Sequence, residues 1–191
     1  MAEALTILAT STAVVALAEM GDKTQLLALV LAARFRAPLA VMTGILVATL
    51  ANHALAAWAG MAVAAWLEGP AFRLIIALGF LAMAVWTLVP DKLDDTARRT
   101  PPGGAFVATT LAFFIVEIGD KTQVATMALA ARYQSLWVVT AGTTLGMMLA
   151  NAPAVWLGER LVKRVPLTLM RRLAATMFAV LGLIALWAAT Q

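Results

Sequence analysis

The sequence predicts an all-α polytopic membrane protein whose six transmembrane helices form two inverted three-helix repeats. Three observations lead to this prediction. Hydrophobic residues make up 63% of the 191 residues, whereas an ordinary soluble domain has about 45–50%. Six apolar segments each approach or exceed the length of about 20 residues that a membrane-spanning helix needs. A polar segment of seven residues also occurs twice, once in each half of the chain.

The six expected spans follow one another with short polar breaks. We place them at residues 5–33, 38–67, 72–89, 105–131, 136–157 and 167–189. Glycine and proline at 69–70 and proline at 90 mark helix ends. The one long polar stretch, 91–104, separates the halves. We therefore expect a first repeat at 1–90, a cytoplasmic linker at 91–104 and a second repeat at 105–191.

The duplicated segment is the most informative feature of the chain. Residues 19–25, Glu-Met-Gly-Asp-Lys-Thr-Gln, recur at 117–123 as Glu-Ile-Gly-Asp-Lys-Thr-Gln, 98 residues later. Gly44 and Gly142 match at the same spacing, and Leu-Ala-Asn at 50–52 resembles 149–151 one residue out of step. Such self-similarity indicates a duplicated structural unit. Because each unit has three spans, the second must enter the membrane from the opposite side, as in many secondary transporters.

The basic residues predict the orientation. Cytoplasmic loops of membrane proteins carry an excess of Lys and Arg. Outside the two motifs, only Arg73 and Arg132 fall on one side of the predicted membrane. The other ten lie on the opposite side: Arg34, Arg36, Lys92, Arg98, Arg99, Arg160, Lys163, Arg164, Arg171 and Arg172. We expect both termini in the periplasm of a bacterial inner membrane, and we assign the basic charge to topology rather than to nucleic-acid binding.

Ionisable residues lie near the centres of the first and fourth spans. A charged side chain there costs about 2.5–3.5 kcal/mol on the insertion scale, so these groups face the protein interior or a wet cavity. Residues three apart share a helix face, so the Glu and the Asp of each motif point the same way. Gly in each motif permits either close helix packing or a local break. The set is Glu19, Asp22, Lys23, Glu117, Asp120 and Lys121.

Carboxylate and amide oxygens suit hard divalent cations such as Ca²⁺, Mg²⁺ and Mn²⁺. Four carboxylates and two ammonium groups leave a charge that one such ion balances. An arriving metal favours ionised ligands and releases their protons, so the site could couple metal to proton movement. The alternative is structural: Glu19–Lys23 and Glu117–Lys121 would form buried ion pairs that hold the bundle together.

At these residues the chain resembles the Gdt family of cation/proton exchangers, which covers bacterial manganese exporters and Golgi calcium/manganese transporters. The resemblance extends over essentially the whole chain. It implies transport of Mn²⁺ or Ca²⁺ in exchange for protons, with the metal held as substrate and no resident cofactor. It also implies that the binding carboxylates are Glu19, Asp22, Glu117 and Asp120, and that the site is completed or supported by Thr24, Gln25, Thr122 and Gln123.

A further group is expected to support the site or balance its charge: Lys23, Lys121, Gly21, Gly119, Asn52 and Asn151. The two Asn residues either line the path or hydrogen-bond across helices. His53 is the only histidine, and it either relays protons or is a satisfied interior residue.

The sequence therefore favours a secondary transporter that exports a divalent cation, Mn²⁺ ahead of Ca²⁺, from the cytoplasm in exchange for protons. Two alternatives stay open: an exporter of small cationic solutes such as basic amino acids, and a cation channel. An enzyme is not expected, because the chain has no Cys, one His and no metalloprotease or nucleotide-binding motif. Nothing in the sequence predicts an oligomeric state.

Overall fold

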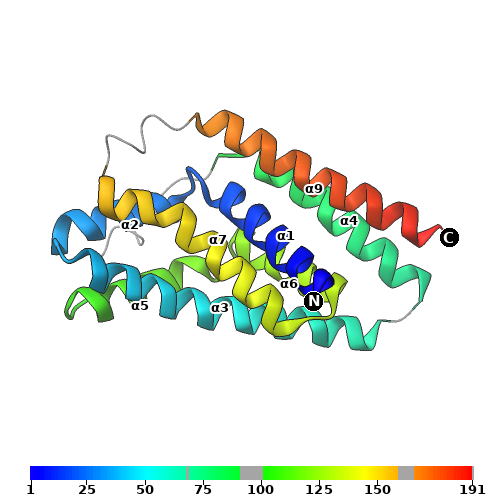
Figure 1. Ribbon diagram of the computed structural model, residues 1–191, viewed down its shortest axis with the longest axis horizontal. Helices are drawn as coiled ribbons and strands as arrows, with labels where there is room; N and C mark the ends of the chain where they lie inside the picture. The colour runs from blue at the N-terminus through cyan, green and yellow to red at the C-terminus, as the bar shows by residue number, and fades with distance from the viewer. Residues whose placement is uncertain (68, 91–100, 159–165, 191) are drawn as a thin grey trace.

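The computed structural model describes residues 1–67, 69–90, 101–158 and 166–190. Within these ranges every regular element is an α-helix, and the helices pack as one bundle with both termini at the same end (Figure 1). The prediction of an all-α fold is confirmed. The helices are α1 (Ala2–Glu19), α2 (Lys23–Phe35), α3 (Pro38–Trp66), α4 (Pro70–Thr87), α5 (Ala105–Glu117), α6 (Lys121–Tyr133), α7 (Leu136–Leu157) and α9 (Leu167–Ala189).

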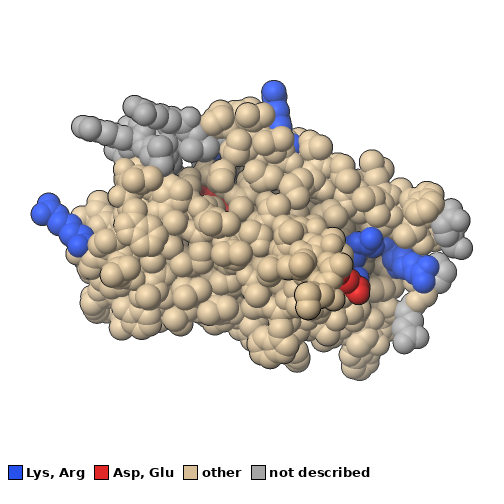
Figure 2. All heavy atoms as spheres, in the orientation of Figure 1, with Lys and Arg blue, Asp and Glu red and all other residues tan. Residues whose placement is uncertain are grey.

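The helices have the length and surface of membrane-spanning elements. In the described chain, α1, α3, α7 and α9 are each long and apolar enough to cross a bilayer, and α4 and α5 are apolar but shorter. Large apolar side chains face outward, including Trp66, Trp137 and Trp156. On the face shown in Figure 2, few charged side chains interrupt a broad uncharged surface. An apolar surface of this extent indicates contact with lipid, so the protein is a multi-pass membrane protein.

Four of the expected spans are confirmed as single helices, and the other two are each divided into two helices. The segments 38–67, 72–89, 136–157 and 167–189 correspond to α3, α4, α7 and α9. The segments 5–33 and 105–131 are not continuous: each is broken at its motif, giving α1 and α2 in one half and α5 and α6 in the other. Most of the predicted linker, 91–100, lies outside the described residues, as do the bases at 160, 163 and 164.

The two halves interlock by equivalent helix crossings. Helix α1 packs against α7 from the other half, α3 packs against α5 and α6, and α4 packs against α9. At the first crossing a Cβ on Gly142 would lie 2.8 Å from both Leu8 O and Ser11 Cβ. At the second, a Cβ on Gly44 would lie 2.8 Å from Thr109 Cβ and 2.9 Å from the carbonyl oxygen of residue 106. The two glycines are 98 residues apart, and so are the residues that they face at the two crossings. Small residues therefore bring both helix pairs equally close.

Candidate metal centre at the helix breaks

Each motif begins with a tight turn that ends one helix and starts the next. In the first copy Met20 has φ −62° and ψ 114°, and Gly21 has φ 82°. The Asp22 N–H donates to Glu19 O at 3.0 Å. This is a type II turn, whose third residue needs a positive φ and is therefore usually Gly. Residues 117–120 form the same turn, with φ −62° and ψ 120°, then φ 76°, and a closing hydrogen bond of 3.1 Å.

The last four residues of each motif cap the second helix. Asp22 is the N-cap of α2, and its side chain accepts a hydrogen bond from Lys23 N at 2.6 Å. Gln25 Oε1 reaches back to accept from Gly21 N at 3.0 Å. The second copy is alike: the Asp at 120 accepts from the residue 122 N–H at 3.3 Å, and the Gln at 123 accepts from the residue 119 N–H at 2.7 Å. This is a variant of the capping box.

The cap explains why the helices break here, and the sequence carried a signal for it. Asp followed three residues later by Gln is a helix-start pattern, and Gly directly before it supplies the turn. Of the two roles expected for the motif Gly, close helix packing or a local break, the structure shows the break. The break matters because carbonyl groups at the end of one helix and N–H groups at the start of the next lack helical partners. Polar backbone is thereby placed next to the buried Glu and Asp side chains of each motif.

Three carboxylates from the two copies meet at these breaks. Glu19, Asp22 and Asp120 each place one oxygen so that all three oxygens lie within 4.8 Å of one another. All three residues are buried. Two come from the first copy and one from the second, so the interlocking of the halves builds the cluster. Oxygens that converge in this way, away from water, are suited to hold a hard divalent cation.

The fourth carboxylate, Glu117, joins the cluster through a threonine. Glu117 is fully buried. The Thr122 hydroxyl lies 3.2 Å from Glu117 Oε2 and 3.3 Å from Asp120 Oδ2, so its proton can bond to either. Among the described residues Glu117 Oε1 and Glu19 Oε2 have no hydrogen-bond donor. A buried carboxylate oxygen without a donor is costly, and a bound cation would satisfy it.

The two motif lysines have different partners. Lys23 Nζ lies 2.7 Å from Asp120 Oδ1, which forms an ion pair between the two halves. Lys121 Nζ donates to Val89 O at 2.7 Å, just after α4. These contacts differ from the Glu19–Lys23 and Glu117–Lys121 pairs of the structural alternative, and the break in each motif interrupts the continuous helix on which that alternative was based. The charge of Lys23 lies against a carboxylate of the opposite copy.

The expected supporting residues bond mainly to backbone. Gln25 uses both ends of its amide, since its Nε2 also donates to Ala150 O at 2.8 Å. Asn52 donates to Phe114 O at 3.0 Å. Asn151 Nδ2 donates to Met147 O at 3.1 Å and lies 3.5 Å from Glu19 Oε1. The asparagines therefore bond across helices or within one, and Asn151 also touches a motif carboxylate.

His53 is not a satisfied interior residue. It is fully buried in α3, and neither ring nitrogen has a hydrogen-bond partner among the residues described. Its Nε2 lies 4.0 Å from Glu117 Oε2. Thr24 is likewise buried, and its hydroxyl has no partner in the described part of the chain. Both residues bring unsatisfied polar atoms into the region of the motifs.

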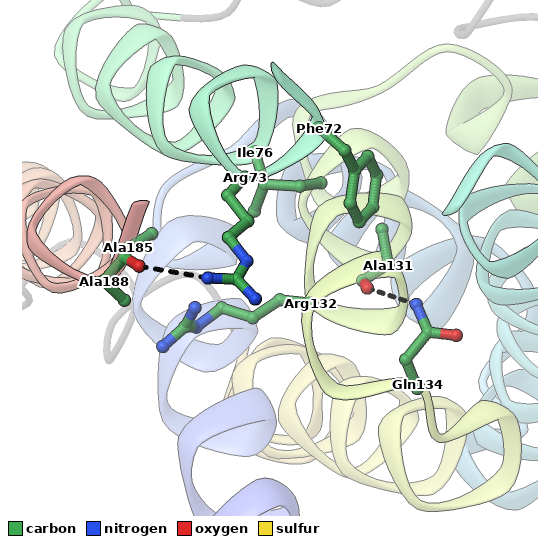
Figure 3. Close-up of a pocket in the computed structure, with 8 residues that line it drawn as sticks. All are labelled: Phe72, Arg73, Ile76, Ala131, Arg132, Gln134, Ala185 and Ala188. Atoms are coloured by element: carbon green, nitrogen blue, oxygen red, sulfur yellow. Dashed lines mark hydrogen bonds between the residues drawn. The ribbon is translucent and has the colours of Figure 1, made fainter. Parts of the chain in front are cut away.

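A separate cavity near the termini does not suit a cation. It measures about 250 Å³ and lies between α4, α6 and α9 (Figure 3). Arg73 and Arg132 extend toward one another in it, and Arg73 donates to Ala188 O at 3.5 Å. At about 1.5 Å per helical residue, Arg132 is roughly 17 Å along α6 from Lys121, where the helix begins. Two guanidinium groups repel a metal ion, so the carboxylate cluster is the better candidate.

The comparison with known families agrees with this geometry. Residues 7–95 and 105–191 match the family described as "Divalent cation/proton antiporter GDT1". The chain belongs to this family. The GDT1 family comprises transporters, so the predictions of a cation/proton exchanger and of a protein that is not an enzyme are confirmed. The matched residues include both motifs and all the described helices apart from the first residues of α1.

Two relatives match nearly the whole chain. A Vibrio cholerae protein named "Putative manganese exporter" is 49% identical over 181 residues, which is 94% of this chain and 90% of the relative. A Synechocystis protein named as GDT1-like is 25% identical over an alignment of 202 residues, covering 91% of this chain and 93% of the relative. No solved structure gives a significant match.

Proposed function

We propose that this GDT1 protein exports Mn²⁺ from the bacterial cytoplasm in exchange for protons, and that the metal binds between the two motifs. The observation that carries the proposal is the meeting of Glu19, Asp22 and Asp120 oxygens within 4.8 Å, inside the bundle and from both halves. Glu117 adds a fourth carboxylate through Thr122. The name of the Vibrio relative supports Mn²⁺ as the substrate, with Ca²⁺ as the other candidate.

The proposed architecture has six spans in two inverted repeats, 1–90 and 105–191, joined by a cytoplasmic linker at 91–104. The first span consists of α1 and α2 together, and the next two are α3 and α4. The fourth span consists of α5 and α6 together, and the last two are α7 and α9. Equivalent glycine crossings and equivalent turns at a spacing of 98 residues support the duplication. Both termini lie at one end of the bundle (Figure 1). The predicted excess of basic residues on the other side makes the terminal end periplasmic.

The chemistry proposed for the site is a competition between metal and protons. Carboxylates crowded together away from water cannot all stay ionised without a compensating charge. With no metal bound, at least one carboxyl of the four holds a proton near neutral pH. A divalent cation favours the ionised form and displaces that proton. If the site then opens to the periplasm, metal leaves and protons return, which couples the two movements.

Transport in proteoliposomes tests this function. The purified full-length protein is reconstituted, and Mn²⁺, Ca²⁺ and Mg²⁺ movements are followed with and without an imposed pH gradient. The expected result is that a proton gradient drives Mn²⁺ against its own gradient, and that Mn²⁺ movement releases protons on the side it leaves. Protein-free liposomes give the background.

Two outcomes would replace the proposal by its alternatives. Rapid Mn²⁺ flow down its gradient, unaffected by the pH gradient, would indicate a channel. Uptake of arginine or lysine with no response to divalent metal would indicate an exporter of cationic solutes. Fusions of a reporter to each terminus test the topology separately, and a C-terminus in the cytoplasm would contradict the inverted arrangement.

A further inference from the structure

The two glutamates of the motifs are touched by different residues at equivalent positions. Asn151 on α7 lies 98 residues after His53 on α3, the same spacing that separates Glu117 from Glu19. Asn151 Nδ2 lies 3.5 Å from Glu19 Oε1, and His53 Nε2 lies 4.0 Å from Glu117 Oε2. Leu-Ala-Asn at 50–52 recurs at 149–151, one residue out of step, so that match aligns Asn151 with Asn52 and not with His53. Each half therefore turns the same helix position toward the other half's glutamate, with an amide in one case and an imidazole in the other.

The imidazole is placed to share an ion with its glutamate. Two atoms that bind one metal at about 2.0–2.6 Å each lie within about 4–5 Å of one another. The 4.0 Å between His53 Nε2 and Glu117 Oε2 falls in this range and is too long for a direct hydrogen bond. Neither nitrogen of His53 has another partner in the described structure, and Glu117 Oε1 has none either. Leaving buried polar atoms unsatisfied is costly, and a bound ligand removes that cost.

A nitrogen ligand discriminates between the candidate substrates. Ca²⁺ takes oxygen ligands. Mn²⁺ also favours oxygen, but it belongs to the first-row series of divalent metals that bind mixed nitrogen and oxygen sites, at the weak end of that series. The carboxylates alone are compatible with Mn²⁺, Ca²⁺ and Mg²⁺. An imidazole in the coordination shell would hold Mn²⁺ while offering Ca²⁺ and Mg²⁺ a poorer ligand than an amide or carboxylate oxygen.

We infer that His53 is a metal ligand in this transporter and that it sets the preference for Mn²⁺ over Ca²⁺. It binds the ion through Nε2 together with Glu117, on the α3 side of the site, while Asn151 holds Glu19 on the α7 side by its amide. The inference rests on the proposed function. It adds a residue outside both motifs and assigns it the choice of substrate.

Exchanging the two side chains tests the inference. His53→Asn gives the α3 position the residue found at its α7 counterpart, and Asn151→His is the reciprocal change. Initial rates of Mn²⁺ and Ca²⁺ transport are measured for wild type, each variant and the double exchange. In His53→Asn the ratio of the Mn²⁺ rate to the Ca²⁺ rate is expected to fall by about 10–100-fold, the range seen when groups that support a metal are lost. The double exchange is expected to restore part of that ratio.

Spectroscopy on the wild-type protein tests the same point and is informative even if the variants do not fold. With Mn²⁺ bound to the purified full chain, pulsed electron paramagnetic resonance should detect coupling to a nitrogen nucleus. That coupling should vanish in His53→Asn and persist in Trp137→Phe, a change at an exposed side chain.

The results separate this inference from the proposed function. If wild type moves Mn²⁺ in exchange for protons but shows no nitrogen coupling, or if His53→Asn leaves the selectivity ratio unchanged, the inference fails and the transport function stands. If wild type moves neither Mn²⁺ nor Ca²⁺, the proposed function fails and the inference fails with it. A drop in both rates by the same factor in His53→Asn would indicate a packing role and would also contradict the inference.

Discussion

The two copies of the motif have the same backbone and different surroundings. Both form a type II turn, and in both the Asp caps the following helix while the Gln accepts a hydrogen bond from the Gly N–H. Around this common frame the contacts differ. Glu19 is touched by Asn151, whereas Glu117 has His53 and the Thr122 hydroxyl nearby. The Thr24 hydroxyl, equivalent to that of Thr122, has no partner in the described structure.

The difference separates what a motif encodes from what its neighbours supply. Turn and cap depend on residues within seven positions of one another, so duplicating the motif duplicates the backbone. The chemistry around each glutamate depends on the helix that crosses it, α7 for one and α3 for the other, and a single substitution there changes it. Two copies of the same turn and cap can thus hold an asymmetric site. Matched substitutions in the two copies can distinguish properties that depend on the turn and cap from properties that depend on the crossing helices.

The largest expected effect is the loss of coupled transport when either glutamate is neutralised. Gln keeps the shape of Glu but cannot ionise, so Glu19→Gln and Glu117→Gln should each insert and fold but lose metal-driven proton release, down to the level of protein-free liposomes. Glu3→Gln, at an exposed position in α1, serves as the control and should match wild type. Wild-type exchange in both motif variants would show that these glutamates do not couple metal to protons. Loss in only one would show that the copies have separate roles.

The ion pair between the halves should contribute to stability. Lys23→Met removes the positive charge that pairs with Asp120 and leaves that buried carboxylate without the Lys23 ion pair. Because the Lys23 side chain is 24% exposed, we expect a loss of about 1–3 kcal/mol in the free energy of unfolding, below the full cost of breaking a buried pair. Unfolding by denaturant in detergent measures it. Lys23→Arg keeps the charge and should lose less than half as much, and equal losses in the two variants would argue against an electrostatic role.

The turn glycines should behave alike in both copies, because each occupies the positive-φ position of the same type II turn. An Ala side chain at a positive φ costs about 1–2 kcal/mol, so Gly21→Ala and Gly119→Ala should destabilise the protein by similar amounts. Gly79 on α4 is the matched control, since a Cβ there meets no atom within 4 Å and its φ is not positive. Gly79→Ala should leave stability unchanged or slightly raised. A large difference between the two turn variants would mean that the turns are not equivalent.

The smallest expected effect separates the two glutamines. Gln25 makes hydrogen bonds at both ends of its amide, to Gly21 N and to Ala150 O. In the described structure Gln123 makes only the bond to Gly119 N. One hydrogen bond contributes about 0.5–1.5 kcal/mol, so Gln25→Ala should cost about 1 kcal/mol more than Gln123→Ala. Denaturant unfolding of the two variants checks this, and equal losses would show that the bond to α7 adds nothing.

Much of the site could be predicted from the sequence because its components are local or repeated. Glu19, Asp22 and Asp120 were chosen as metal ligands from their place in a duplicated motif inside apolar spans, and the structure brings these three together. The motif Gly left a helix break open, but the apolar runs on both sides also fit a continuous helix, so the hydrophobic pattern could not decide between the two. The ion pair of Lys23 with Asp120 could not be predicted by spacing, because 97 residues separate the two.

The sequence by itself determined the membrane class, the duplication, the positions of four single-helix spans and the identity of the motif residues. These properties follow from hydrophobic content and from residue order, which need no knowledge of the fold. Only the tertiary structure decided which copy's lysine meets which carboxylate, and that His53 lies beside Glu117 while Asn151 lies beside Glu19. Such contacts depend on how the helices of one half cross those of the other. Close approach at small residues fixes that crossing, and its partners are far apart along the chain.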